Sequence, residues 1–221
     1  MVDMRTKTPG TRLRNALWGS NASARLQAAL TAGTRPDESY IEVLVERCEV
    51  ETNFFVRDML TWALTRHDPA LTVEVVLSQL HSESAQARSQ ALHTLSKIGD
   101  PATWAAITVD LLRDPDLEVA RAAWRTAAGL VPQGRETELA EELVSQLGRG
   151  DRETQRSLSR AFAALGGAAK PVVEDAANCR NQAVSAHAVA TLAIMADPDE
   201  GFDGAIAEAE RVVALRGAPT L

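Results

Sequence analysis

The fold is decided by the stretch DPDLEVARAA at residues 114–123, in which a turn leads directly into a helix. Asp114 and Pro115 favour a turn, and Asp116 can cap a helix because its carboxylate accepts hydrogen bonds from free backbone N–H groups. The residues that follow are mostly good helix formers and include one arginine, Arg121. The stretch therefore predicts the start of the second helix of a two-helix unit.

Arginines recur at a regular distance along the chain, early in each predicted second helix. They are Arg57, Arg88, Arg121 and Arg156, and the gaps between them are 31, 33 and 35 residues. Such a period is typical of an α-solenoid, in which each pair of helices is too small to bury its own apolar face and stacks on its neighbours. We therefore predict an all-α fold, a right-handed α-solenoid of about five two-helix repeats with capping helices at both ends.

Capping residues and helix stop signals divide the array into five units. The predicted helix pairs are 38–48 with 53–67, 70–81 with 84–98, 102–113 with 116–130, 136–147 with 151–165, and 168–178 with 182–196. Further helices are expected at 22–32, ended by Gly33, around 13–17, and at 202–215. The predicted division is a tail with capping helices at 1–36, the array at 37–198, and a capping helix with a tail at 199–221.

The composition fits a helical protein. Aromatic residues make up 4% of the 221 residues, and runs rich in Val, Ile or Thr are scarce, which disfavours β-sheets. Cys48 and Cys179 form no C-x-x-C pair and are expected to be buried, in a reducing compartment. We find neither a signal peptide nor a long apolar run, so we expect a cytoplasmic protein that does not enter a membrane.

The stretch at 114–123 resembles the HEAT-repeat pattern, in which a short Asp/Pro turn leads into a helix with Val-Arg or Ala-Arg and then alanine. Val56-Arg57, Ala87-Arg88 and Gln155-Arg156 repeat it with decreasing fidelity, and LSKIGDP at 95–101 looks like the unit ending of bacterial HEAT proteins. The resemblance covers residues 37–198. It implies a curved platform for other macromolecules, with the second helices on the concave side and the four marked arginines pairing with turn carboxylates as structural residues.

Charge differs between the two sets of predicted helices. The first helices carry eleven acidic and three basic residues, whereas the second helices carry nine basic and five acidic ones. A mildly positive second-helix face would attract a protein partner with an acidic surface. The candidate binding residues on that face are Trp62, Arg66, His93, Lys97, Arg125 and Arg160, which include residue types frequent at interface hot spots.

Simpler interpretations compete with this one. The charges on the second helices can be solvated or paired within the stack, and Trp62 can be a partly buried residue between two units. Trp124 and Trp104 are expected to pack in the core, and Trp18 to fasten the N-terminal capping helices. The net charge of −7 argues against bulk electrostatic binding of nucleic acid.

Catalytic motifs are missing from the sequence. It has no Gly-rich phosphate loop, no Gly-x-Ser-x-Gly elbow and no His-Glu-x-x-His pair, and its four histidines lack a second ligand at helical spacing. We therefore expect a non-catalytic scaffold without a cofactor or metal. Two alternatives stay open, namely an enzyme like the HEAT-like alkylpurine DNA glycosylases, which would need a continuous positive groove, and an accessory subunit of a prosthetic-group lyase.

Overall fold

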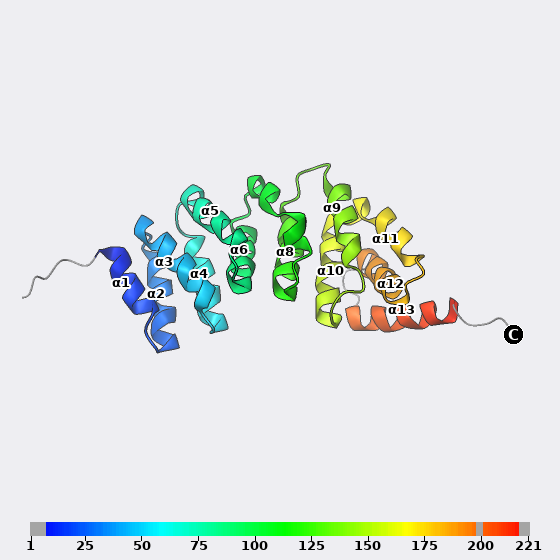
Figure 1. Ribbon diagram of the computed structural model, residues 1–221, viewed down its shortest axis with the longest axis horizontal. Coiled ribbons are helices and arrows are strands. Elements are labelled where there is room, and N and C mark those ends of the chain that lie inside the picture. Colours follow the sequence, from blue (N-terminus) through cyan, green and yellow to red (C-terminus); the bar gives the residue numbers. More distant parts are fainter. Residues whose placement is uncertain (1–7, 198–200, 217–221) are drawn as a thin grey trace, which may run out of the picture. The chain divides into compact units, whose positions relative to one another are not determined.

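In the computed structural model, which describes residues 8–197 and 201–216, all regular secondary structure is helical (Figure 1). Helices that follow one another pack in pairs, and within each of the two parts of the chain described next the second helix of one pair packs on the second helix of the following pair. This arrangement is that of an α-solenoid of HEAT-like repeats. The prediction of an all-α repeat fold is confirmed.

The chain forms two compact parts, each made of several helix pairs, one up to Ala106 and one from Ile107 onward. We call them the N-terminal unit and the C-terminal unit. The N-terminal unit contains α1 (Pro9–Leu17), α2 (Ala22–Thr34), η1 (Glu38–Tyr40), α3 (Ile41–Val50), α4 (Phe54–Leu64), α5 (Pro69–Ser78), η2 (Gln79–His81), α6 (Ala85–Ile98) and η3 (Pro101–Ala106). Helix α2 packs on α4 and α4 on α6, whereas α1 packs on α3 and α3 on α5. The unit therefore has a layer of first helices and a layer of second helices.

The C-terminal unit continues the same scheme. It contains α7 (Val109–Leu112), α8 (Leu117–Leu130), α9 (Glu136–Leu143), η4 (Val144–Gln146), α10 (Arg152–Leu165), η5 (Gly166–Ala168), α11 (Lys170–Ala177), α12 (Gln182–Ala196) and α13 (Phe202–Arg216). The second helices α8, α10 and α12 pack in that order, and α13 packs on α12.

The second helices begin at polar caps. The capping side chains, each of which accepts a hydrogen bond from a backbone N–H in the first turn of its helix, are Asn21, Asn53, Ser84, Asp116, Asp151 and Asn181. At the other end of α6, Gly99 adopts a φ of 75°, a left-handed conformation that favours glycine. These local signals explain why the predicted second helices start close to where the structure starts them.

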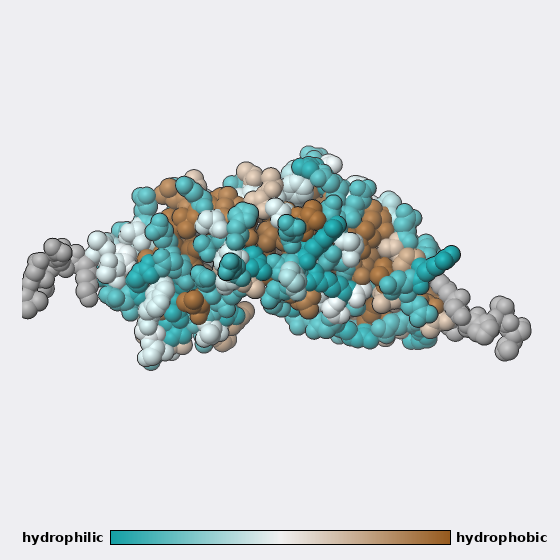
Figure 2. Space-filling view, viewed as in Figure 1, coloured by the Kyte–Doolittle hydropathy of each residue, from teal (hydrophilic) through white to brown (hydrophobic). Residues whose placement is uncertain are grey.

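Large apolar side chains fill the space between the two layers of each unit. Leu60 and Leu92 are fully buried in the N-terminal unit, as Trp124 and Phe162 are in the C-terminal unit. The indole Nε1–H of Trp124 donates to the Leu112 carbonyl oxygen at 2.8 Å, which confirms its place in the core. In the space-filling view, hydrophobic side chains show between helices of both units within a mainly hydrophilic surface (Figure 2).

Two predicted helices differ from those in the structure. The predicted helix at 102–113 is a 3-10 segment, η3, followed by the short α7, because Pro101 starts the segment and the β-branched Ile107, Thr108 and Val109 disfavour a continuous helix. The predicted stop at Gly33 is also wrong, since α2 runs through this glycine to Thr34.

The two cysteines differ in burial. Cys48 is buried, as expected, and burial raises the pKa of its thiol to about 12. Cys179 is exposed, so the expectation that it is buried was wrong. It lies between α11 and α12, where its thiol donates to the backbone carbonyl of Asn181. Trp104 is only half-buried rather than part of the fully buried core.

Candidate functional site: a pocket lined by arginines

Two of the four marked arginines hold the turns that precede their helices. Arg57 and Arg88 are each four residues past an N-cap, and each donates from Nη1 to two turn carbonyl oxygens at 2.8 to 3.1 Å. Arg25 makes the same pair of contacts, to Gly19 and Ser20, and lies 32 residues before Arg57. We call Arg25, Arg57 and Arg88 the turn arginines. Arg25 is not among the predicted marked arginines, although its distance of 32 residues from Arg57 fits their period.

The other two marked arginines are five residues past their caps and contact carboxylates. Arg121 donates to Glu118 at 2.9 Å and to Glu153 of the next second helix at 2.6 Å. Arg156 donates to Asp203 of α13 at 2.8 Å. The HEAT resemblance implies that all four arginines pair with turn carboxylates. Arg121 and Arg156 do pair with carboxylates, but these lie in the first turns of helices and not in the turns between them.

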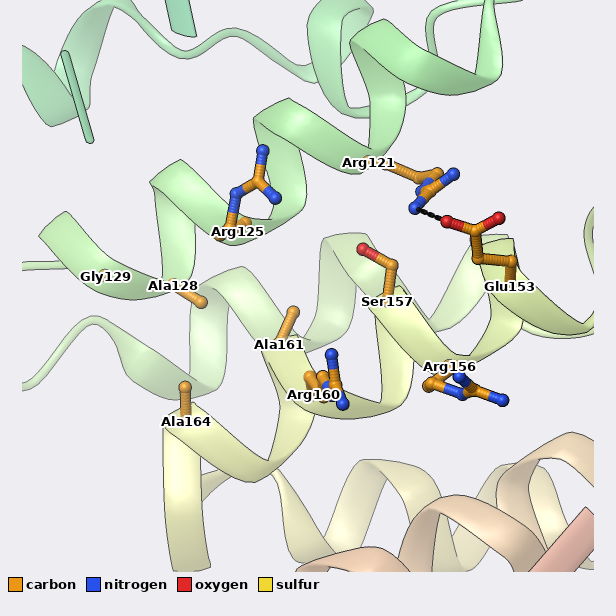
Figure 3. A pocket seen from close by; sticks show the side chains of 10 residues that line it. All are labelled: Arg121, Arg125, Ala128, Gly129, Glu153, Arg156, Ser157, Arg160, Ala161 and Ala164. Atoms are coloured by element: carbon orange, nitrogen blue, oxygen red, sulfur yellow. Dashed lines mark hydrogen bonds and ion pairs between the residues drawn. The ribbon is translucent and has the colours of Figure 1, made fainter. Parts of the chain in front are cut away.

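Arg121 and Arg156 line one pocket together with Arg125 and Arg160, two of the predicted binding residues (Figure 3). The two residues on α8 are one turn apart, as are the two on α10, so each pair faces the same side of its helix. We call this site the arginine pocket. Its volume is about 260 Å³.

The pocket exists because the rest of its lining is small. Ala128 and Gly129 on α8, and Ala161 and Ala164 on α10, leave the space open. At the positions equivalent to Gly129 and Ala164, thirteen residues past the cap, the N-terminal unit has Arg66 and Lys97. The side chain of Ser157 points from α10 toward α8 within the pocket (Figure 3).

Only two of the four arginines in the pocket form ion pairs with carboxylates. Arg121 and Arg156 form the ion pairs described above, whereas Arg125 and Arg160 make no hydrogen bond or ion pair with any residue that the structure describes. Although Arg125 is exposed overall, desolvation of its guanidinium and the charge of Arg121 lower its pKa. The pocket thus presents two uncompensated cations in a recess, which can bind an anion.

The other four predicted binding residues lie in the N-terminal unit. Trp62 is on α4, Arg66 follows the end of α4, and His93 and Lys97 are on α6. Arg66 and Lys97 are exposed and His93 is half-buried. Trp62 is 38% exposed, and its ring lies so close to α2 that a Cβ on Gly33 would be 2.4 Å from a ring carbon. The ring therefore packs between neighbouring helices, in agreement with the alternative interpretation of this residue.

A buried carboxylate organises the N-terminal unit and was not predicted. Glu51 is fully buried and accepts hydrogen bonds from both Nε and Nη2 of Arg25, from Arg47 and from the Asn53 backbone N–H, all at 2.7 to 3.0 Å. Burial alone would raise the pKa of Glu51, but these donors outweigh it and lower the pKa to about 2. Its role is structural, since every donor belongs to the framework.

A buried histidine sits at the centre of a second polar cluster. The Gly148 backbone N–H donates to Nδ1 of His187 at 2.9 Å, so the proton is on Nε2, which lies 3.0 Å from the Gln155 carbonyl oxygen and 3.2 Å from Ser159 Oγ. Burial lowers the pKa of His187 to about 4. Because Nε2 is protonated, the imidazole cannot act as a base toward Ser159, and the cluster is structural.

Within the described ranges, neither a metal-binding cluster nor a membrane-spanning helix is present. No three His, Cys, Asp or Glu side chains in them lie close enough together to hold a metal ion. No helix within residues 8–197 and 201–216 combines the length and apolar character required to cross a membrane.

Comparison with known proteins adds only distant similarities. No protein-family model and no curated protein matches the sequence. The crystal structure of an engineered protein from the Northeast Structural Genomics Consortium is 20% identical with a TM-score of 0.49, over 93% of this chain and 96% of that chain. The complex of CpcE and CpcF of phycocyanin lyase from Nostoc sp. PCC7120 is 15% identical with a TM-score of 0.37, over 96% and 99%. Neither similarity is close enough to bear on function.

Proposed function

We propose that this protein is a non-catalytic helical-repeat scaffold that binds an acidic segment of a protein partner on its second-helix face. The observation that carries the proposal is the arginine pocket, in which Arg125 and Arg160 stay unpaired next to two paired arginines. Unpaired guanidiniums in a recess are well placed to bind carboxylates of a partner, because they carry donors that no residue of the described chain occupies.

The charge distribution around the pocket agrees with a local site. The protein as a whole is acidic, with a net charge of −7, and would repel an acidic partner at long range. Binding must therefore rely on short-range contacts in the pocket. Arg66, just past the end of α4, and Lys97, near the end of α6, are exposed in the N-terminal unit and lie at equivalent distances from the caps of their helices, and we propose them as secondary contacts.

A direct test uses a fluorescein-labelled oligoglutamate peptide and the full-length protein. Fluorescence anisotropy should show binding that weakens as salt is raised, and R125A/R160A should reduce the affinity about tenfold or more. The matched control is R35A/R180A, which removes the same charge from two exposed arginines outside the pocket. Equal losses in both variants would mean that only net charge matters and would contradict the proposal.

The helical melt provides a second control. Arg125 and Arg160 are exposed and unpaired within the described part of the chain, and each repels an arginine one turn away, so R125A/R160A should unfold at the temperature of the wild type or slightly above it. R66A/K97A tests the secondary contacts in the same assay, because both side chains are exposed. If this variant weakens binding more than R125A/R160A does, the main site lies in the N-terminal unit and not in the arginine pocket.

A further inference from the structure

The two unpaired arginines, Arg125 on α8 and Arg160 on α10, line the same pocket. Glu118 and Glu153 pair with Arg121, and Asp203 pairs with Arg156, so the four arginines exceed the three carboxylates by one positive charge, and Arg125 and Arg160 are the two without an ion pair. A track for a polyanion would need a row of unpaired cations, since each phosphate of a nucleic acid contributes a separate contact. The pocket instead suits a single anionic group.

The donors around this pocket come from several directions. Arg125 is on α8, whereas Arg160 and Ser157 are on α10, and the buried Nε of Arg156 has no hydrogen-bond partner among the described residues (Figure 3). A carboxylate has two oxygens in one plane. A phosphomonoester has three terminal oxygens in a tetrahedral arrangement and a charge of about −1.5 to −2 at neutral pH, so it can use donors on both walls.

Arginine is also the side chain best suited to this ligand, because its planar fork binds two phosphate oxygens at once. A volume of about 260 Å³ is just below the range of about 300–1,000 Å³ that is usual for small-molecule sites. It suits one phosphate group and the first atoms of the side chain that carries it. A dianionic phosphate can also compete with Glu153 for Arg121, because its charge is higher.

We infer that the arginine pocket binds one phosphomonoester group, carried by a phosphorylated serine or threonine of the partner. This inference rests on the proposed function and narrows the acidic segment to a phosphorylated one. The chemistry of the site is reversible binding, and no bond is made or broken.

The test compares three labelled peptides, Gly-Ala-X-Ala-Gly, in which X is phosphoserine, glutamate or serine, with the full-length protein. The phosphoserine peptide should bind about tenfold more tightly than the glutamate peptide, and inorganic phosphate should displace it. R125A/R160A should abolish this preference, S157A should reduce it, and R35A/R180A should leave it intact. R125K/R160K keeps the charge but loses the fork, so it should lose most of the preference as well.

The outcomes separate the inference from the proposed function. Equal affinity for the phosphoserine and glutamate peptides would overturn the phosphate inference and leave the proposed function standing. No binding of either peptide, together with no binding of oligoglutamate, would overturn both. Tighter binding of a short oligothymidylate than of the phosphoserine peptide would assign the pocket to a nucleic-acid backbone and would also overturn the inference.

Discussion

Two arginines one turn apart on a helix repel each other, and the arginine pocket contains two such pairs. Arg121 lies one turn before Arg125 on α8, and Arg156 one turn before Arg160 on α10. Like charges at this spacing destabilise a helix by a few tenths of a kcal/mol per pair. Carboxylates compensate only the first member of each pair, so the second members cost stability without a structural return. Residues that lower stability in this way are typical of functional sites.

His187, in contrast to these arginines, has a structural role. It is buried in its neutral form, so the stability of the fold depends on its protonation state. Its pKa is about 4 in the folded protein and about 6.5 in an unfolded chain. Between these values the unfolded state binds a proton that the folded state does not, so stability is lost as the pH falls from 6.5 to 4. The loss attributable to His187 is about 2 kcal/mol at pH 5.

Urea unfolding at pH 7 and pH 5 measures this effect. H187Q removes the titrating group, so the decrease in stability between the two pH values should be about 2 kcal/mol smaller than in the wild type. H81Q is the control, because His81 is exposed and its substitution should leave the decrease unchanged. A wild-type-like pH dependence in H187Q would contradict the buried, neutral state of His187.

Among the helices, the predicted ends agree with the structure where residues next to the end determine it. Asp116 and Gly99 mark helix ends by their own hydrogen bonds and backbone conformation, and the structure uses them in that way. The prediction that Gly33 ends its helix was wrong. Glycine is common at helix ends, but here a contact with a neighbouring helix requires a residue without a side chain. The ring of Trp62 leaves no room for a side chain at this point of α2.

The same distinction holds for the candidate site. Arg125 and Arg160 could be identified from the repeat register, because they lie nine residues past their caps. The pocket between them could not, since it depends on the small side chains of Ala128 and Ala164 and on which arginines find carboxylates. These are pairwise properties of packed helices, and a single sequence does not give them.

Two glycine substitutions separate helix propensity from packing. On propensity alone, alanine is about 1 kcal/mol better than glycine inside a helix. G129A in α8 should be stabilising by up to this amount, because nothing lies within 4 Å of the added Cβ. G33A should instead be destabilising by about 1–3 kcal/mol, because its Cβ would overlap the Trp62 ring and approach the Ala63 Cα at 2.9 Å.

Urea unfolding of both variants is the measurement, with the wild type alongside. W62L in the G33A background should recover part of the loss, since it removes the closer of the two overlaps and leaves the backbone contact. A G33A protein that is as stable as G129A would show that α2 and α4 are further apart than the structure places them.

At the scale of the whole chain, the question is whether residues 1–36 merely cap the array. Helix α2 packs on α4, and Arg25 of α2 supplies two of the hydrogen bonds to the buried Glu51. Arg25 also repeats the turn contacts of Arg57 and Arg88. These contacts indicate that α1 and α2 are as much part of the framework of the N-terminal unit as the later pairs. The predicted division at residue 37 would separate Glu51 from its main partner.

Two variants test whether α1 and α2 belong to the framework of the N-terminal unit: one removes a single ion pair and the other removes both helices. R25A keeps α2 in place but leaves the Glu51 carboxylate buried with fewer donors, and we expect a loss on the order of 3 kcal/mol, as is usual when one partner of a buried ion pair is removed. Deletion of residues 1–36 should cost more, because it also removes the packing of α2 on α4 and of α1 on α3. Thermal melts followed by circular dichroism measure both losses. A chain of residues 37–221 that melts at the temperature of the full-length protein would show that α1 and α2 only cap the array, and the R25A result would then have to come from Glu51 alone.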